Sequence, residues 1–234
     1  MADRNVTDKT SCPARRQAES RLRHEILQPI AAMRMVADVL KSEGQPDVRS
    51  KAVRALNGSL DQVEKAVTAI IDYQSLSSGT ITPFVQDIEI SELIASRLEA
   101  FENSATVAGV TLRSIGPVQE IKTDPGLLSI CIDAFLENAI DFTEIGSVDI
   151  LIKDLRAGVE ITVRDTGVGL DGLDTEALWA PYAIARTERA RRVTRLGLGL
   201  ARAEAAASLI EADVFLRSRP DASGAEASII LPKT

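Results

Sequence analysis

Apolar residues in the first third of the chain recur at helical spacing. In one stretch they are Leu22, Ile26, Ile30, Met33, Ala37 and Leu40, and in the next they are Ala52, Leu56, Leu60, Val63, Val67, Ile70 and Ile71. Steps of three and four residues place such side chains on one face of an α-helix. The pattern therefore predicts two long helices, separated by turn-forming residues at 43–47.

Two long helices joined by a short turn form a helical hairpin, which we assign to residues 14–79. A single hairpin covers little of its own apolar face, so we expect a homodimer in which two hairpins form a four-helix bundle. The polar residues 1–13 are interpreted as a disordered leader.

The pattern changes after Gly79, and we assign residues 80–234 to a second domain that mixes strands and helices. The expected strands lie within 80–90 and at 110–115, 147–153, 160–165, 214–218 and 227–231. The expected helices are 91–108, with Ser91 as its N-cap, 124–142 and 198–210. These segments favour a layered α/β domain, which makes the whole chain an α+β protein.

Composition excludes several classes of protein. Aromatic residues make up only 3% and the net charge is −7, which argues against a nucleic-acid partner. No apolar run reaches about 18 residues, so we expect no membrane insertion. The N-terminus is polar, and Cys12 and Cys131 have no metal-ligand spacing. We therefore expect a reduced, cytoplasmic protein without structural zinc, in which Cys131 is buried.

The single histidine, His24, is the first candidate for chemistry. At 100° per residue it lies about 200° from Leu22 and Ile26, so it is expected to face solvent. The neighbouring Glu25 can orient the imidazole and accept its proton, which suits a nucleophile. The alternative is a surface histidine without a chemical role.

Two glycine-containing segments are candidates for binding an anionic ligand. Asp165, Gly167 and Gly169 follow a predicted strand, where glycine permits a close approach to a ligand. Gly197–Leu198–Gly199 opens a predicted helix, directly after an arginine-rich stretch at 186–195. The alternatives are an ordinary glycine turn and a solvated run of charge.

Asn138 and Asp141 lie three residues apart on one side of a predicted apolar helix. Their oxygens could ligate Mg²⁺ or a water bound to it. The alternative is a polar stripe that faces water.

In this order, the segments resemble the motifs of sensor histidine kinases in two-component signalling. His24-Glu25-Ile26-Leu27-Gln28-Pro29 looks like the phosphoacceptor box, and Ala134–Thr143 looks like the N box. Asp165–Gly169 and Gly197–Leu200 look like the two glycine boxes, with Leu178–Tyr182 resembling the box between them. The resemblance covers residues 14–234. It implies a phosphotransfer hairpin followed by an ATP-binding α/β two-layer sandwich of the histidine kinase and gyrase type.

The resemblance also implies a role for each matched residue. His24 would be the phosphoacceptor and Glu25 its general base, while Gln28 stands where some members position water for dephosphorylation. Asn138 would bind Mg²⁺, with Asp141 beside it. Asp165 would hold the adenine amino group, and Gly167 and Gly169 would line its pocket. Gly197, Leu198 and Gly199 would lie under the phosphates, covered by a lid that includes Arg192 and Arg195.

The implied function is ATP-dependent autophosphorylation of His24 and transfer to an aspartate of a response regulator receiver domain, with phosphatase activity toward that regulator as an addition. Four residues depart from the family pattern on the phosphate side of the pocket: Ala134, Asp141, Arg195 and Leu196. These departures leave two alternatives open, a histidine phosphotransferase relay protein and a pseudokinase. Only the 13 residues of the leader precede the hairpin, so we expect either a short protein that receives its signal from a separate sensor protein or a piece of a longer chain.

Overall fold

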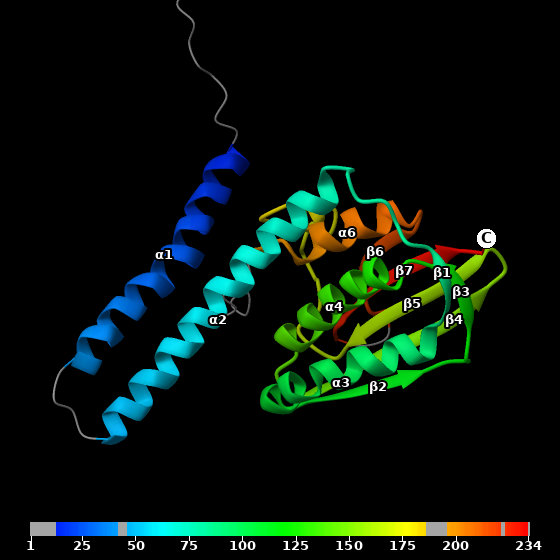
Figure 1. Cartoon of the computed structure of the whole chain (residues 1–234). Helices are drawn as coiled ribbons and strands as arrows, with labels where there is room; N and C mark the ends of the chain where they lie inside the picture. The colour runs from blue at the N-terminus through cyan, green and yellow to red at the C-terminus, as the bar shows by residue number, and fades with distance from the viewer. Residues whose placement is uncertain (1–12, 42–45, 186–195, 221–222, 234) are drawn as a thin grey trace, which may run out of the picture. The chain divides into compact units, whose positions relative to one another are not determined.

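The computed structural model describes residues 13–41, 46–185, 196–220 and 223–233 (Figure 1). The chain divides into two compact units, residues 1–66 and 67–234. Their boundary lies inside the second long helix. The predicted leader, apart from Pro13, lies outside the described residues.

The two predicted long helices are α1 (Pro13–Lys41) and α2 (Pro46–Ser77). Large apolar side chains on both helices remain exposed in the single chain, among them Leu27, Met35, Val53 and Leu60. The single chain therefore leaves an apolar surface along the hairpin uncovered.

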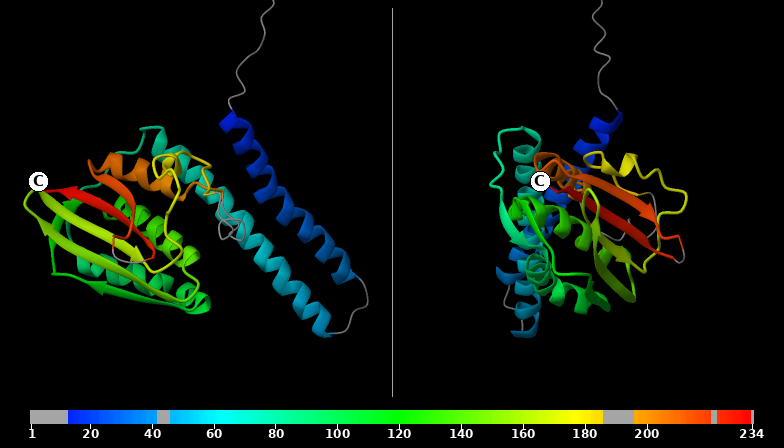
Figure 2. Two further views of the ribbon diagram at one scale, coloured as in Figure 1. Left: turned by 180° about the vertical axis from the view of Figure 1, so that it is seen from behind. Right: turned by 90° about the vertical axis from the view of Figure 1, so that its right-hand side faces the viewer.

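The second unit contains a five-stranded sheet in the order β2-β4-β5-β7-β6. Its strands are β2 (Val110–Ile115), β4 (Gly146–Leu155), β5 (Gly158–Asp165), β6 (Asp213–Ser218) and β7 (Ala225–Pro232). β2 pairs with β4 in parallel, and the other neighbours are antiparallel. The helices α3 (Ile90–Ala108), α4 (Pro125–Phe142) and α6 (Gly199–Leu209) form the second layer (Figure 2). The predicted two-layer α/β sandwich is confirmed.

The helix α4 is the centre of the core. Asp124 caps it by accepting hydrogen bonds from the backbone N–H groups of Gly126 and Leu127, and Pro125 occupies its first turn. Nine of its residues are buried, including Cys131, as predicted. Burial raises the pKa of the Cys131 thiol to about 12, so this cysteine is inert.

Replacing Phe135 with alanine is expected to destabilise the second unit by about 3–5 kcal/mol, because the ring is buried and leaves a cavity. Phe135 also packs edge-on against Trp179, at 6.3 Å between ring centroids. Trp179 is the only tryptophan, so its fluorescence during urea unfolding reports on this unit. Phe84→Ala is the matched control: that side chain is 73% exposed, and its loss should cost under about 1 kcal/mol. Equal unfolding midpoints for the two variants would contradict the prediction.

The structure corrects the sequence-based prediction at three places. Ser91 is not the N-cap of α3: the helix begins at Ile90, after Glu89, so the prediction was wrong. Ile90 is fully buried, and its N–H donates to the carbonyl of Gln119. Because of these long-range contacts, α3 begins one residue before the predicted start. A strand β3 (Glu120–Thr123), paired with β1 (Gln86–Glu89), and a short helix η1 (Ala177–Trp179) were not predicted.

A row of alternating charges crosses the sheet on the face away from the helices. Its members occupy directly paired positions on the five strands: Arg113, Asp149, Arg164, Glu226 and Arg217. Glu226 is buried and accepts hydrogen bonds from Arg164 and Arg217, at 2.7 and 2.8 Å. Burial acts to raise the pKa of Glu226, but the hydrogen bonds and charges of Arg217 and Arg164 outweigh it and lower that pKa below its ordinary value.

Because the pKa of Glu226 is lowered by folding, its ionised form stabilises the folded state, and this contribution is lost on acidification. The stability difference between wild type and Glu226→Gln is expected to be full above an ordinary glutamate pKa of 4.5 and to shrink as pH falls below it. Thermal unfolding of both proteins across that pH range measures it. A difference that stays constant with pH would contradict the prediction.

Candidate functional site

The carboxylate of Asp165 lies at the end of β5, where the strand turns into a glycine-containing loop. The residue is only 6% exposed, and its Oδ1 accepts a hydrogen bond from the N–H of Gly167 at 2.8 Å. Burial raises the pKa of Asp165, and the backbone N–H groups of Gly167 and Ala225 and the charge of Arg219 oppose that rise. Two backbone donors thus orient the carboxylate, which can accept a further hydrogen bond from a ligand donor such as an amino group.

The loop after Asp165 lies close to the C-terminal end of α4. A side chain at Gly167 would place its Cβ 2.2 Å from the carbonyl oxygen of Phe142, so only glycine fits there. The N–H of Val168 donates to the same carbonyl at 3.3 Å. Gly169 has a φ of +73°, which also favours glycine. The loop is therefore held against α4 by its backbone.

The second glycine segment leads into α6. Gly197 has a φ of +71°, and a Cβ there would lie 2.3 Å from the carbonyl oxygen of Ala183. Leu196 and Leu198 on either side are buried and anchor the segment. Gly199 is the first residue of α6, so the backbone N–H groups of this first turn lack partners within the helix and can bind an anion.

Asn138 lies beside this helix start. Its Oδ1 is 4.0 Å from the place where a Cβ on Gly199 would lie. Asp141 is half-buried one turn later on α4. Amide and carboxylate oxygens are ligands that Mg²⁺ accepts. Among the described residues no group of three or more His, Cys, Asp or Glu could hold a metal.

The structure therefore brings three of the predicted segments together around α4. The Asp165 loop contacts the end of the helix at Phe142, and the Gly199 segment lies beside Asn138. Ala134, one turn before Asn138, is buried and supplies no ligand. The predicted Arg192 and Arg195 lie outside the described residues.

His24, Glu25 and Gln28 lie within α1. The side chains of His24 and Glu25 are outside the described part of the structure, so the solvent-facing His24 stays a prediction. Gln28 is exposed. Pro29 lies inside α1 and has no N–H to donate to the carbonyl of Glu25, four residues before it.

Sequence reasoning missed three residues that contact the Asp165 loop from the hairpin between β6 and β7: Arg219, Ser223 and Gly224. Arg219 bonds the carbonyl of Asp165, and Ser223 bonds the carbonyl of Gly167. These residues are more than 50 positions from the loop, and an arginine or a Ser-Gly pair in a turn gives no signal of such a contact. Within the described residues, no helix is long and apolar enough to cross a bilayer.

Two family models match the chain in succession. Residues 14–79 match the His Kinase A (phospho-acceptor) domain, and residues 123–234 match the histidine kinase-, DNA gyrase B-, and HSP90-like ATPase. Together these matches cover most of the chain, and they coincide with the helical hairpin and with the part of the second unit that carries the glycine segments.

Relatives and solved structures agree with these matches. The sensor histidine kinase AtsR of Burkholderia thailandensis is 26% identical over 215 residues, which are 89% of this chain and 36% of that protein. The Acinetobacter baumannii histidine kinase AdeS superposes with a TM-score of 0.72 at 16% identity, covering 90% of this chain and 98% of that one. Histidine kinase ThkA, solved in complex with response regulator protein TrrA, gives a TM-score of 0.69 at 18% identity, covering 92% and 61%. The chain spans between about a fifth and about half of the length of the curated relatives it matches.

Proposed function

Because the chain belongs to the histidine kinases, with a phospho-acceptor domain followed by an ATPase-type domain, we propose that it binds ATP with Mg²⁺ and phosphorylates itself on His24. The phosphoryl group is then transferred to an aspartate on the receiver domain of a response regulator. The observation that carries this proposal is Asp165, a buried carboxylate held by two backbone N–H groups. Its loop contacts the end of α4, and Asn138 on the same helix lies beside a helix start suited to phosphate.

Nucleotide recognition follows from the polarity of the site. The ionised carboxylate of Asp165 accepts a hydrogen bond from the exocyclic amino group of adenine. Guanine presents a carbonyl oxygen at the equivalent position, and its contact with a buried carboxylate would be repulsive, so the site should prefer adenine. The first turn of α6 and the glycines before it would receive the phosphates. Asn138 would hold Mg²⁺ through its Oδ1, and the ion would supply positive charge beside the phosphates.

Phosphoryl transfer assigns complementary roles to His24 and Glu25. Glu25 accepts the Nδ1 proton of His24 while the Nε2 attacks the γ-phosphorus in line, and ADP leaves with the electrons of the broken P–O bond. The catalysis is mainly positioning and neutralisation of charge. By the family resemblance, Arg192 and Arg195 would supply positive charge to the phosphates. Gln28, exposed one turn after His24, positions water when the phosphorylated regulator is hydrolysed.

The proposed assembly is a homodimer through the hairpin, and the proposed partner is a response regulator. The exposed apolar side chains of α1 and α2 support the dimer. ThkA, which has the same fold, was solved in complex with a response regulator, and this supports the second partner.

The test is incubation of the purified chain with γ-labelled ATP and Mg²⁺, followed by acid and alkali treatment of the labelled protein. Phosphohistidine is expected, seen as label that survives alkali and is lost in acid. Chelation of Mg²⁺ should prevent labelling. Adding a purified receiver domain should move the label to it.

Calorimetric titration with ADP separates the alternatives when no label appears. Absence of both label and nucleotide binding would contradict the kinase and favour a phosphotransfer relay that is charged by another protein. ADP binding without label would favour a pseudokinase.

A further inference from the structure

Residues of the hairpin between β6 and β7 form hydrogen bonds to the backbone of the Asp165 loop. The Nη1 of Arg219 donates to the carbonyl oxygen of Asp165 at 3.1 Å. The Oγ of Ser223 donates to the carbonyl oxygen of Gly167 at 2.6 Å. These two carbonyls lie on either side of the turn in which the Gly167 N–H bonds the Asp165 carboxylate. We call Arg219, Ser223 and Gly224 the hairpin clamp.

Gly224 permits this close approach. Its φ is +119°, and a Cβ there would lie 2.1 Å from the carbonyl oxygen of Asp165 and 3.1 Å from the Cδ of Arg219. The N–H of Arg219 donates to the carbonyl of Gly224 at 3.1 Å, which closes the hairpin. The backbone of the clamp is therefore in direct contact with the backbone of Asp165, and the clamp's hydrogen bonds do not depend on a ligand.

We infer that the hairpin clamp is a positioning element of the nucleotide site: Arg219 and Ser223 hold the turn that aims the Asp165 carboxylate. The inference rests on the proposed function. Both clamp bonds satisfy carbonyls of the turn itself, so they restrict its backbone before the nucleotide arrives. A site ordered in advance loses less entropy on binding, and the benefit appears as affinity. The Arg219 charge also favours the ionised form of Asp165, the form that can accept a hydrogen bond from adenine.

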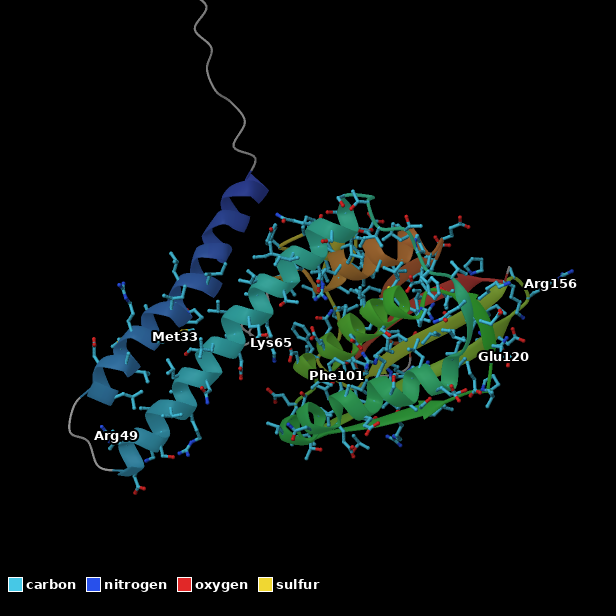
Figure 3. The ribbon with its side chains drawn as sticks, in the orientation of Figure 1. Met33, Arg49, Lys65, Phe101, Glu120 and Arg156 are labelled. Atoms are coloured by element: carbon cyan, nitrogen blue, oxygen red, sulfur yellow. The ribbon has the colours of Figure 1, made fainter. Side chains whose placement is uncertain are left out.

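The test measures ADP affinity of the whole chain in the presence of Mg²⁺. Arg219→Ala is expected to weaken ADP binding about tenfold, and Ser223→Ala about threefold. Arg219→Lys should recover part of the loss, because its ammonium keeps the charge and one donor. The matched control is Arg156→Ala, at the exposed turn between β4 and β5 on the opposite end of β5 from Asp165 (Figure 3). That variant should bind ADP as wild type does.

The pH dependence distinguishes positioning of the carboxylate from general loosening of the domain. Among the described residues, Arg219 is the charged side chain that acts on Asp165. Without it the pKa of Asp165 rises further, so less of the carboxylate is ionised at mildly acidic pH. The ratio of the two dissociation constants, Arg219→Ala over wild type, should therefore grow as pH falls. Titration of the ADP phosphates is the same for both proteins and cancels in this ratio.

The outcomes separate this inference from the proposed function. If wild type binds ADP and Arg219→Ala, Arg219→Lys and Ser223→Ala bind it equally well, the clamp has no positioning role and the proposed function stands. A pH-independent affinity ratio would also overturn the inference. If wild type binds no ADP, that result contradicts both the proposed function and this inference. Should Arg219→Ala fail to fold, Arg219→Lys and the exposed Ser223→Ala still decide the question.

Discussion

Replacing Asp165 with asparagine is expected to weaken adenine-nucleotide binding by about 100-fold and to abolish autophosphorylation at ordinary ATP concentrations. The N–H of Gly167, which bonds Oδ1 of the carboxylate, would bond the amide oxygen instead. The amide NH₂ would then face the exocyclic amino group of adenine, placing donor against donor. The variant loses a hydrogen bond to a charged acceptor and gains a contact between two donors. Together these changes correspond to a loss of about 2–3 kcal/mol in binding free energy.

The measurement is titration of the variant and wild type with ADP, beside Asp171→Asn as the matched control. Asp171 is an exposed aspartate in the same loop, so the same change there should leave the affinity within about twofold. Wild-type affinity in Asp165→Asn would show that the nucleotide is held elsewhere, and would remove the observation on which the proposed function depends.

The second large effect is expected at His24. His24→Ala removes the only imidazole of the chain, so incorporation of label from γ-labelled ATP should fall to background. ADP affinity should stay unchanged, because the nucleotide residues belong to the second unit. Asp165→Asn and His24→Ala therefore both lose autophosphorylation, the first at nucleotide binding and the second at phosphoryl transfer. Titration with ADP distinguishes them.

A chemical check makes the His24 result specific. Label that persists in His24→Ala and is stable to acid would indicate a serine or threonine acceptor and would contradict the proposed chemistry. Far-ultraviolet circular dichroism confirms that the helices of the variant are intact. Loss of ADP binding in His24→Ala would mean that the substitution disturbs the whole chain, and the labelling result would then no longer identify the acceptor.

Local patterns along the chain were sufficient to predict most elements of the fold. The long helices have apolar residues at helical spacing, and α4 combines the capping residue Asp124 with an apolar run. The boundaries failed where long-range contacts decide them: α3 begins at Ile90 because that residue is buried and bonded to Gln119. The strand β3 is four residues long and pairs with β1 more than 30 positions earlier, so no local pattern announces it.

In the candidate site, too, the sequence identified single residues, and the tertiary structure showed which of them lie together. Asp165, Gly167, Gly197 and Asn138 could be identified from sequence, because each lies in a short motif whose residue types suit a nucleotide. The position of Asn138 beside Gly199, and of the Asp165 loop against Phe142, required the tertiary structure.

The sequence alone determined the order of most helices and strands, the histidine next to an acid, and the glycine motifs of the candidate site, since these depend on neighbouring residues. Only the tertiary structure decided which distant side chains support them. Arg219 and Ser223 reach the Asp165 loop because of the register in which β6 pairs with β7. The row of alternating charges that begins at Arg113 on β2 and ends at Arg217 on β6 is aligned by the registers of all five paired strands. Register is a property of paired strands, and a shift of one residue turns each side chain to the other face of the sheet.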